Sequence, residues 1–180
     1  MPFFPVSPLQ TPRLMLRELN VDDWEQILYL RSDPLVNAYV NRTLSKSKED
    51  AIAFIINTIE NNRAGRAAYW GIVLPDINKV IGCICLWKFS DDQTTAEIGY
   101  ELSVAAQGKG YMTEAMNAVL EFGFATIGLS TIEAYTQSNN GASIRLLEKF
   151  RFCLLADRRD EKNPLNSVFA LHMELSLIHI

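Results

Sequence analysis

The sequence predicts a single mixed α/β domain, with a sheet of about seven strands and helices flanking it. Strand-like runs alternate with helix-like runs along all 180 residues. A strand, a long helix and a second strand in the middle of the chain predict a parallel crossover, which is right-handed in nearly all proteins. No repeat, low-complexity tract or break in composition divides the chain, so we expect residues 1–180 to form one domain.

The part of the chain before the crossover is predicted to form a strand, two helices and an antiparallel meander. Asn20 and Asp22 offer oxygens that can cap a helix, and Pro34 stops the helical spacing that follows them. Ser47 begins a second helix, and a Pro-Asp-Ile-Asn-Lys segment resembles a hairpin turn. The expected elements are a strand over 13–19, helices over 24–33 and 47–65, and strands over 67–74, 80–88 and 94–102.

The rest of the chain begins with a Gln-Gly-Lys-Gly turn that leads directly from the last of these strands into a helix. Met112, Ala115, Met116 and Val119 fall on one face of this helix. The further expected elements are that helix over 111–127, a strand over 131–137, a helix over 143–150, and closing strands over 152–158 and 168–175.

Composition excludes several classes of function. The formal net charge of −4 argues against nucleic acid as the main partner, since phosphate binding needs clustered Lys and Arg. No apolar run is long enough to span a membrane, and the N-terminus lacks the pattern of a secretory signal. Three cysteines without a C-x-x-C motif predict reduced, buried thiols. We therefore expect a cytoplasmic protein that works without nucleic acid or membrane.

The glycine turn predicts an anion site. Gly108 and Gly110 precede a helix N-terminus, where backbone N–H groups and the helix dipole favour a phosphate. A P-loop is excluded because Lys109 is followed by glycine, and a dinucleotide fingerprint because Thr113 stands at its third glycine position. The turn suits a diphosphate held by consecutive amides; a plain strand-to-helix connection that uses glycine for a tight bend is the alternative.

Four segments, in order and at matching spacing, strengthen the first interpretation. They are TPRLMLREL with the DDW and SDPLV that follow it, AEIGYEL, QGKGYMTEA and NNGASIRLLEKFRF. Together they resemble the GNAT superfamily of acetyl-CoA-dependent N-acetyltransferases, and within it the branch that acetylates the N-termini of ribosomal proteins. The resemblance covers nearly the whole chain and implies acetyl-CoA as the donor, with no metal.

The resemblance also implies where acetyl-CoA would bind. Asn140 matches an asparagine expected to contact the pantetheine, and Ser143 a serine placed near the thioester sulfur. Ala105 and Arg151 depart from the family pattern: Ala105 replaces a common Gln or Arg, and Arg151 replaces a glycine in the bend after the last helix. The pyrophosphate is expected on Gln107, Gly108, Lys109, Gly110, Tyr111, Met112 and Thr113, and the pantetheine along the backbone of Tyr100, Glu101 and Leu102.

Glu97 is the candidate general base. The two-residue period of a strand places Glu97 and Glu101 on the face opposite the apolar Ile98 and Tyr100. A carboxylate there could take a proton from an amine directly or through water, although a solvated or ion-paired surface carboxylate is an equal alternative. Ser143 is the candidate group for the departing thiolate, because Leu147 occupies the position where many relatives carry a tyrosine acid. A helix-surface serine that makes a local hydrogen bond is the alternative for Ser143.

The predicted reaction is direct transfer of acetyl from acetyl-CoA to a primary amine. No activated nucleophile is apparent, since the cysteines lack a paired histidine. The acceptor stays open between a protein N-terminal α-amine and a small-molecule amine, and a homodimer is one possible assembly. Two other classes remain as alternatives: an acyl-CoA-binding sensor without turnover, and a nucleotide-binding module, which the incomplete motifs disfavour.

Overall fold

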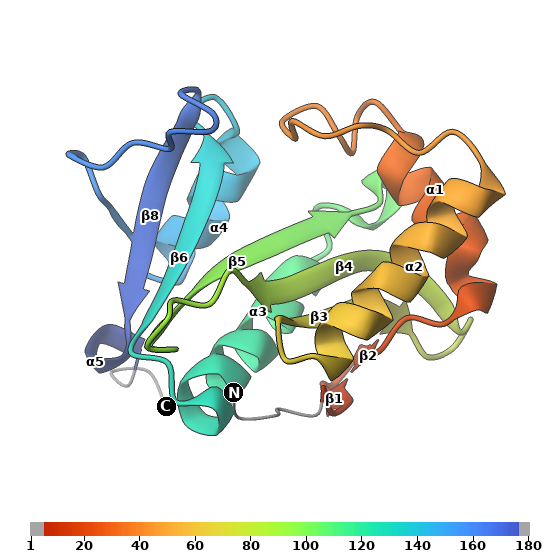
Figure 1. Ribbon diagram of the computed structural model, residues 1–180, viewed down its shortest axis with the longest axis horizontal. Coiled ribbons are helices and arrows are strands. Elements are labelled where there is room, and N and C mark those ends of the chain that lie inside the picture. The colour runs from red at the N-terminus through yellow and green to blue at the C-terminus, as the bar shows by residue number, and fades with distance from the viewer. Residues whose placement is uncertain (1–5, 177–180) are drawn as a thin grey trace.

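An eight-stranded mixed sheet runs through the molecule in the order β1-β2-β3-β4-β5-β6-β8-β7 (Figure 1). The structure is a computed structural model that describes residues 6–176. The strands are β1 (Leu9–Gln10), β2 (Met15–Arg17), β3 (Ala67–Leu74), β4 (Lys79–Trp87), β5 (Thr95–Leu102), β6 (Thr131–Gln137), β7 (Cys153–Leu154) and β8 (Asn166–His172). The helices are α1 (Trp24–Ser32), α2 (Lys48–Arg63), α3 (Tyr111–Glu121), α4 (Gly141–Lys149) and α5 (Met173–Ser176).

The predicted mixed α/β class is confirmed, and the strand count rises from about seven to eight. The added strand is the two-residue β1, which pairs with β2 at the edge of the sheet. The closing strands differ more from prediction. The strand expected over 152–158 is reduced to β7, at the opposite edge, where it pairs only through Cys153 and Leu154. β8 ends at His172 because the chain then turns into α5.

Helices α1 and α2 cover one face of the sheet. Ser47 and Asp50 form a reciprocal capping box at the start of α2, as the sequence predicts for a helix beginning there. The two helices bury an apolar stripe against β3 and β4. The core on this face contains Leu19, Ile27, Leu30, Ala51, Ile55, Val73, Val80 and Cys83.

Helix α3 covers the opposite face. Met116 and Val119 are fully buried and belong to the same cluster as Ile84, Leu86 and Ile98 of the central strands. The helix continues into a π-helical turn, Phe122–Ile127, so the helical stretch reaches the predicted limit near 127. Since α3 joins β5 to the parallel strand β6, the predicted crossover is confirmed.

No helix within residues 6–176 has the length and apolar character that a membrane span requires. His179, which the sequence places near the chain end, lies outside the described residues.

Candidate active site

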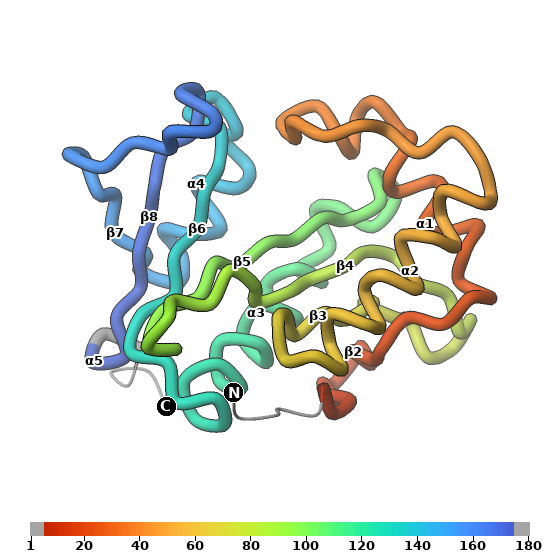
Figure 2. Tube along the Cα trace, viewed as in Figure 1, coloured from red at the N-terminus to blue at the C-terminus, as the bar shows by residue number. Residues whose placement is uncertain are grey.

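The parallel strands β5 and β6 separate halfway along their length. Their pairing runs from Thr95 opposite Thr131 to Ile98 opposite Ala134, and no further pair follows, although both strands continue. Figure 2 shows the two traces close together at their starts and diverging toward their ends. β4 still pairs with β5 as far as Leu102, so only the β6-facing edge of β5 is left open. An open strand edge can pair with an extended ligand as an added strand would.

A cleft of about 480 Å³ occupies the space between the separated strands. Residues from β5, the glycine turn, β6, α4 and the loop between α1 and α2 line it. Of the predicted cofactor residues, Lys109 is the one that does not line the cleft; it is exposed beside it. The structure thus brings the predicted donor residues, which are distant in sequence, to one place.

The glycine turn has the backbone conformation of an anion site. Gly108 and Gly110 have φ angles of 72° and 80°, in the left-handed region that glycine adopts most readily. Nothing lies within 4 Å of a Cβ added at Gly108, so a side chain would have room there. The positive φ angle, and not a lack of space, therefore explains why glycine occupies this position. Within residues 6–176, no hydrogen bond occupies the backbone N–H groups of residues 108–113. These groups are therefore free to bind phosphate oxygens.

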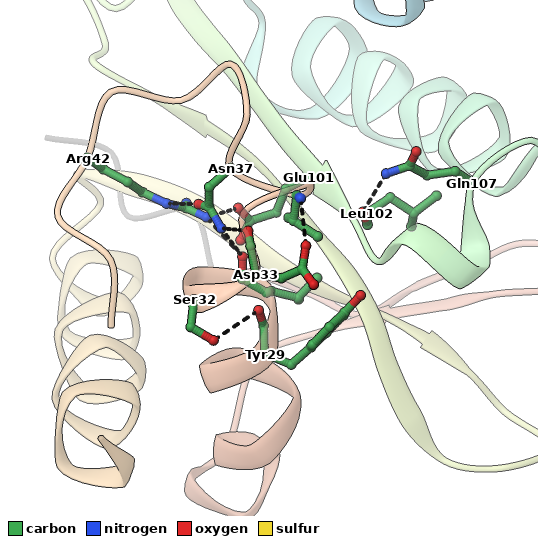
Figure 3. A network of polar contacts seen from close by, with 10 residues as sticks. Tyr29, Ser32, Asp33, Asn37, Arg42, Glu101, Leu102 and Gln107 are labelled. Atoms are coloured by element: carbon green, nitrogen blue, oxygen red, sulfur yellow. Dashed lines mark hydrogen bonds and ion pairs between the residues drawn. The ribbon is translucent and has the colours of Figure 1, made fainter. Parts of the chain in front are cut away.

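The Gln107 side chain connects this turn to β5. Its Nε2 donates to the carbonyl of Leu102 over 3.1 Å (Figure 3). That bond fixes the end of the open strand relative to the turn. The two parts of the predicted cofactor site, strand backbone and glycine turn, are therefore tied to each other by a side chain from the same site.

Two hydroxyl groups meet on the α4 side of the cleft. The oxygens of Tyr100 and Ser143 are 2.6 Å apart, and Ser143 is buried. Burial is the main influence on Tyr100 and raises the pKa of its phenol to about 12, so it stays protonated at neutral pH. Asn140 caps α4 by accepting a hydrogen bond from the Ser143 backbone N–H over 3.2 Å. Sequence reasoning did not identify Tyr100 as the partner of Ser143.

Glu97 lies beside the cleft but does not line it. Its carboxylate pairs with Lys88 Nζ over 2.5 Å, and burial raises its pKa while the hydrogen bond and charge of Lys88 oppose that rise. Lys88 also lies over the ring of Tyr135, with 5.6 Å between the ammonium nitrogen and the ring centroid. Tyr135 does line the cleft. Glu97 is thus linked to the lining of the cleft through Lys88, which contacts both Glu97 and Tyr135.

Glu101 is the one carboxylate among the described residues that line the cleft. Its Oε2 is 2.5 Å from Arg42 Nη2, and its Oε1 is buried without a hydrogen-bond partner in the described chain. Arg42 also donates to Asn37 Oδ1 and to the Leu30 carbonyl, in the network drawn in Figure 3. Sequence reasoning missed Arg42 and Asn37, because their loop carries no periodic pattern.

The loop between α1 and α2 forms the other wall of the cleft. Leu35, Val36, Tyr39 and Val40 line it, and Leu35 is 70% exposed. Of the aromatic residues that the structure describes between residues 6 and 90, Tyr39 is the one that lines the cleft. This wall is apolar and open to solvent, as a binding surface for a second substrate would be.

The cysteines are placed differently from one another. Cys83 and Cys85 are buried thiols as predicted, and burial is the main reason that their pKa values are raised, to about 12 for Cys85. The prediction that all three thiols are buried is wrong for Cys153, which is exposed because β7 lies at the sheet edge. In residues 6–176, no group of three or more His, Cys, Asp or Glu side chains is arranged to hold a metal.

A second hollow, of about 610 Å³, lies between Gly65–Arg66 and the loop of residues 88–93. None of the cofactor-site motifs contributes to it, and it lacks a helix N-terminus. We therefore assign the chemistry to the cleft between β5 and β6.

Comparison with known proteins identifies the family. The model of the acetyltransferase (GNAT) domain matches residues 13–153. This chain is a GNAT acetyltransferase. The Bacillus licheniformis protein named uncharacterized N-acetyltransferase p20 is 31% identical to it over 167 residues, covering 91% of this chain and 94% of that protein. The acetyltransferase described here is accordingly an enzyme that uses acetyl-CoA as its acetyl donor.

Solved structures agree with the fold of this GNAT acetyltransferase. An acetyltransferase of the GNAT family from Bacillus anthracis has a TM-score of 0.77 at 25% identity, covering 93% of this chain and 99% of that one. The ribosomal-protein-S5-alanine acetyltransferase from Vibrio fischeri has a TM-score of 0.79 at 18% identity, covering 92% and 96%. An identity this low shows a shared fold and leaves the acceptor open.

Proposed function

We propose that this acetyltransferase transfers acetyl from acetyl-CoA directly to a primary amine, with a protein N-terminal α-amine as the favoured acceptor. The observation that carries the proposal is the cleft itself, where an open strand edge leads into a glycine turn at a helix N-terminus. The pyrophosphate would lie on residues 107–113, and the pantetheine would extend along the backbone of residues 100–102. The thioester would then lie near Ser143, where β5 and β6 part.

In the proposed reaction, the neutral amine nitrogen attacks the thioester carbon. The C–N bond forms, the C–S bond breaks, the amine gives up a proton, and the departing thiolate gains one. Glu97 is the proposed base, acting through water, since its side chain does not line the cleft and is paired with Lys88. Its raised pKa makes it a stronger base than an ordinary glutamate.

Ser143 and Tyr100 are proposed to assist the thiolate. Leu147, at the position where many relatives carry a tyrosine acid, is fully buried and has no proton to give. The hydroxyl pair is a chemically reasonable replacement, because Tyr100 keeps its proton and donates toward Ser143 or the thiolate. The buried cysteines, with raised pKa values, support direct transfer rather than a covalent intermediate.

The favoured acceptor class rests on the sequence resemblance to ribosomal N-terminal acetyltransferases, and on the shared fold of the Vibrio fischeri protein with that named activity. An N-terminal peptide is an extended chain that would have to enter from the open, apolar side of the cleft, beside Leu35 and Tyr39. A small apolar amine would fit the same wall, and it is the second candidate.

Release of free thiol from acetyl-CoA tests the proposal across a panel of amines. The panel should contain N-terminal peptides beginning with Ser or Ala, the same peptides with a blocked N-terminus, free amino acids, and small apolar amines. We expect turnover with free N-terminal peptides and none with blocked ones. Turnover confined to small amines would replace the acceptor class, and tight acetyl-CoA binding without any turnover would indicate a sensor.

A further inference from the structure

The short loop between β1 and β2 brings Arg13 to the glycine turn. Glu114, in the first turn of α3, accepts hydrogen bonds from Arg13 Nε over 2.7 Å, from the Arg13 backbone N–H over 2.8 Å and from Thr11 Oγ1 over 2.5 Å. Arg13 Nη1 donates to the Lys109 carbonyl over 3.1 Å. Segments about 100 residues apart in sequence are thus joined at the predicted phosphate site.

The guanidinium of Arg13 is only partly used by these contacts. It lies over the Tyr111 ring, 4.8 Å from the ring centroid, and a Cβ added at Gly110 would be 3.4 Å from Nη2. Within the described chain, Nη2 has no hydrogen-bond partner, and the Arg13 side chain is 49% exposed whereas that of Glu114 is 15% exposed. The Glu114 carboxylate binds Nε of the guanidinium. Nη2, which has no partner in the described chain, lies next to Gly110 and the unpaired backbone amides of the turn.

We propose that Arg13 binds a phosphate of the acetyl donor and holds the glycine turn in place for it. This inference rests on the proposed function, because it takes the turn to be the pyrophosphate site. Guanidinium groups bind phosphate oxygens through charge-assisted hydrogen bonds, which are stronger than neutral ones. The ligand class is a diphosphate ester, and the contribution of Arg13 adds to that of the backbone amides.

The same segment contains an Arg–carboxylate pair in which both terminal nitrogens of the guanidinium are used. Arg17, on β2, forms two hydrogen bonds to Asp23, each of 2.8 Å, and its side chain is 18% exposed. That pair ties β2 to the turn before α1, on the face opposite α3. Arg17 is therefore the matched control for Arg13: the same side chain in a carboxylate pair, without a neighbouring anion site.

The experiment compares wild type, Arg13→Gln and Arg17→Gln in calorimetric titrations with CoA and with pantetheine, which lacks the phosphates and the adenosine. Arg13→Gln keeps the bonds from the Arg13 backbone N–H and Thr11 to Glu114, so we expect it to fold. We expect CoA to bind Arg13→Gln about 10- to 100-fold more weakly, a loss typical of one charge-assisted hydrogen bond. Pantetheine affinity should not change, and Arg13→Lys should recover part of the loss.

Each outcome separates the inference from the proposed function. Arg17→Gln should lower the Tm and leave the ratio of CoA to pantetheine affinity unchanged. If Arg13→Gln binds CoA as wild type does, or loses CoA and pantetheine equally, then Arg13 is structural and the inference is wrong, while turnover of wild type still supports the proposed function. If wild type binds CoA no better than pantetheine, the turn is not a phosphate site, and the inference is wrong together with the proposed position of the pyrophosphate; thiol release still decides the proposed reaction.

Discussion

The two halves of the cleft, which we propose bind the donor and the acceptor, are built differently. The donor half, from β5 through the glycine turn to α3, offers mainly backbone groups: an open strand edge and the unpaired amides of residues 108–113. The acceptor half, from the loop between α1 and α2, offers side chains instead, held by the Arg42–Glu101 pair. Backbone geometry suits a donor that never changes, whereas side chains can vary with the acceptor. We therefore expect substitutions in the two halves to affect different substrates.

The largest expected effect concerns the proposed base, Glu97, which belongs to neither half because it does not line the cleft. Glu97→Gln keeps the size of the side chain and removes its basicity, so kcat/KM should fall by about 10²- to 10⁴-fold while acetyl-CoA affinity is retained. The pKa of Glu97 is raised, so its basic form is complete only above that raised value, and wild-type activity should increase as the pH rises through it. The loss should shrink at high pH, where the free amine accumulates.

Glu101→Gln is the comparison for that variant, measured over the same pH range. Glu101 lines the cleft but is paired with Arg42. If Glu97→Gln turns over like wild type while Glu101→Gln loses activity, the base belongs to the cleft wall and Glu97 is structural.

The next effect is confined to the donor half. Gly110→Asp places a side chain and a negative charge at the turn, in a residue with φ of 80°. Acetyl-CoA affinity, measured by calorimetry, should fall by about 100-fold or more, because phosphate approach is blocked and repelled. Gly128→Asp is the control, since it has a φ of 84° and lies at the end of the helical stretch, away from the cleft. Gly128→Asp should lower the stability of the protein and leave acetyl-CoA affinity unchanged. Similar losses of affinity in both variants would mean that backbone strain alone weakens binding.

A substitution in the acceptor half should impair use of the acceptor and leave acetyl-CoA binding unchanged. Arg42→Met leaves the Glu101 carboxylate, 8% exposed, without its cation, which we expect to cost about 3 kcal/mol of unfolding free energy. The acceptor KM should rise and acetyl-CoA affinity should hold. Urea unfolding and two-substrate kinetics measure these quantities. The double variant Arg42→Met/Glu101→Gln removes the unpaired charge and should recover much of the stability; no recovery would show that the ion pair is not the cause.

How far the sequence predicts the molecule follows the same division. Glycines, helix caps and alternation determine backbone geometry, so the crossover, the Ser47 cap and the turn at Gly108 and Gly110 were all predictable. The Arg42–Glu101 pair joins positions 59 residues apart through a loop without periodicity, and only the folded chain shows it. The closing strand over 152–158 was overestimated because β-like composition does not reveal where an edge strand stops pairing.

The smallest expected effect concerns a departure from the family pattern. Arg151 occupies the glycine position after α4 and has a φ of 62°, so the bend is retained with a side chain in the left-handed region. Arg151→Gly should relieve that strain and raise stability by about 0.5–1 kcal/mol, a small increase in Tm, without changing either substrate's affinity. A lower Tm would show that the contacts of the Arg151 side chain outweigh the strain.

Hydrogen exchange of backbone amides, with and without CoA, tests the central claim most directly. If the donor site is built from backbone, CoA should slow exchange at residues 99–102 and 107–113, where amides gain partners. Exchange in residues 35–40 of the acceptor loop and in residues 88–93 around the second hollow should stay unchanged. Protection at residues 88–93 with none at the glycine turn would contradict the account and move the donor site away from the cleft between β5 and β6.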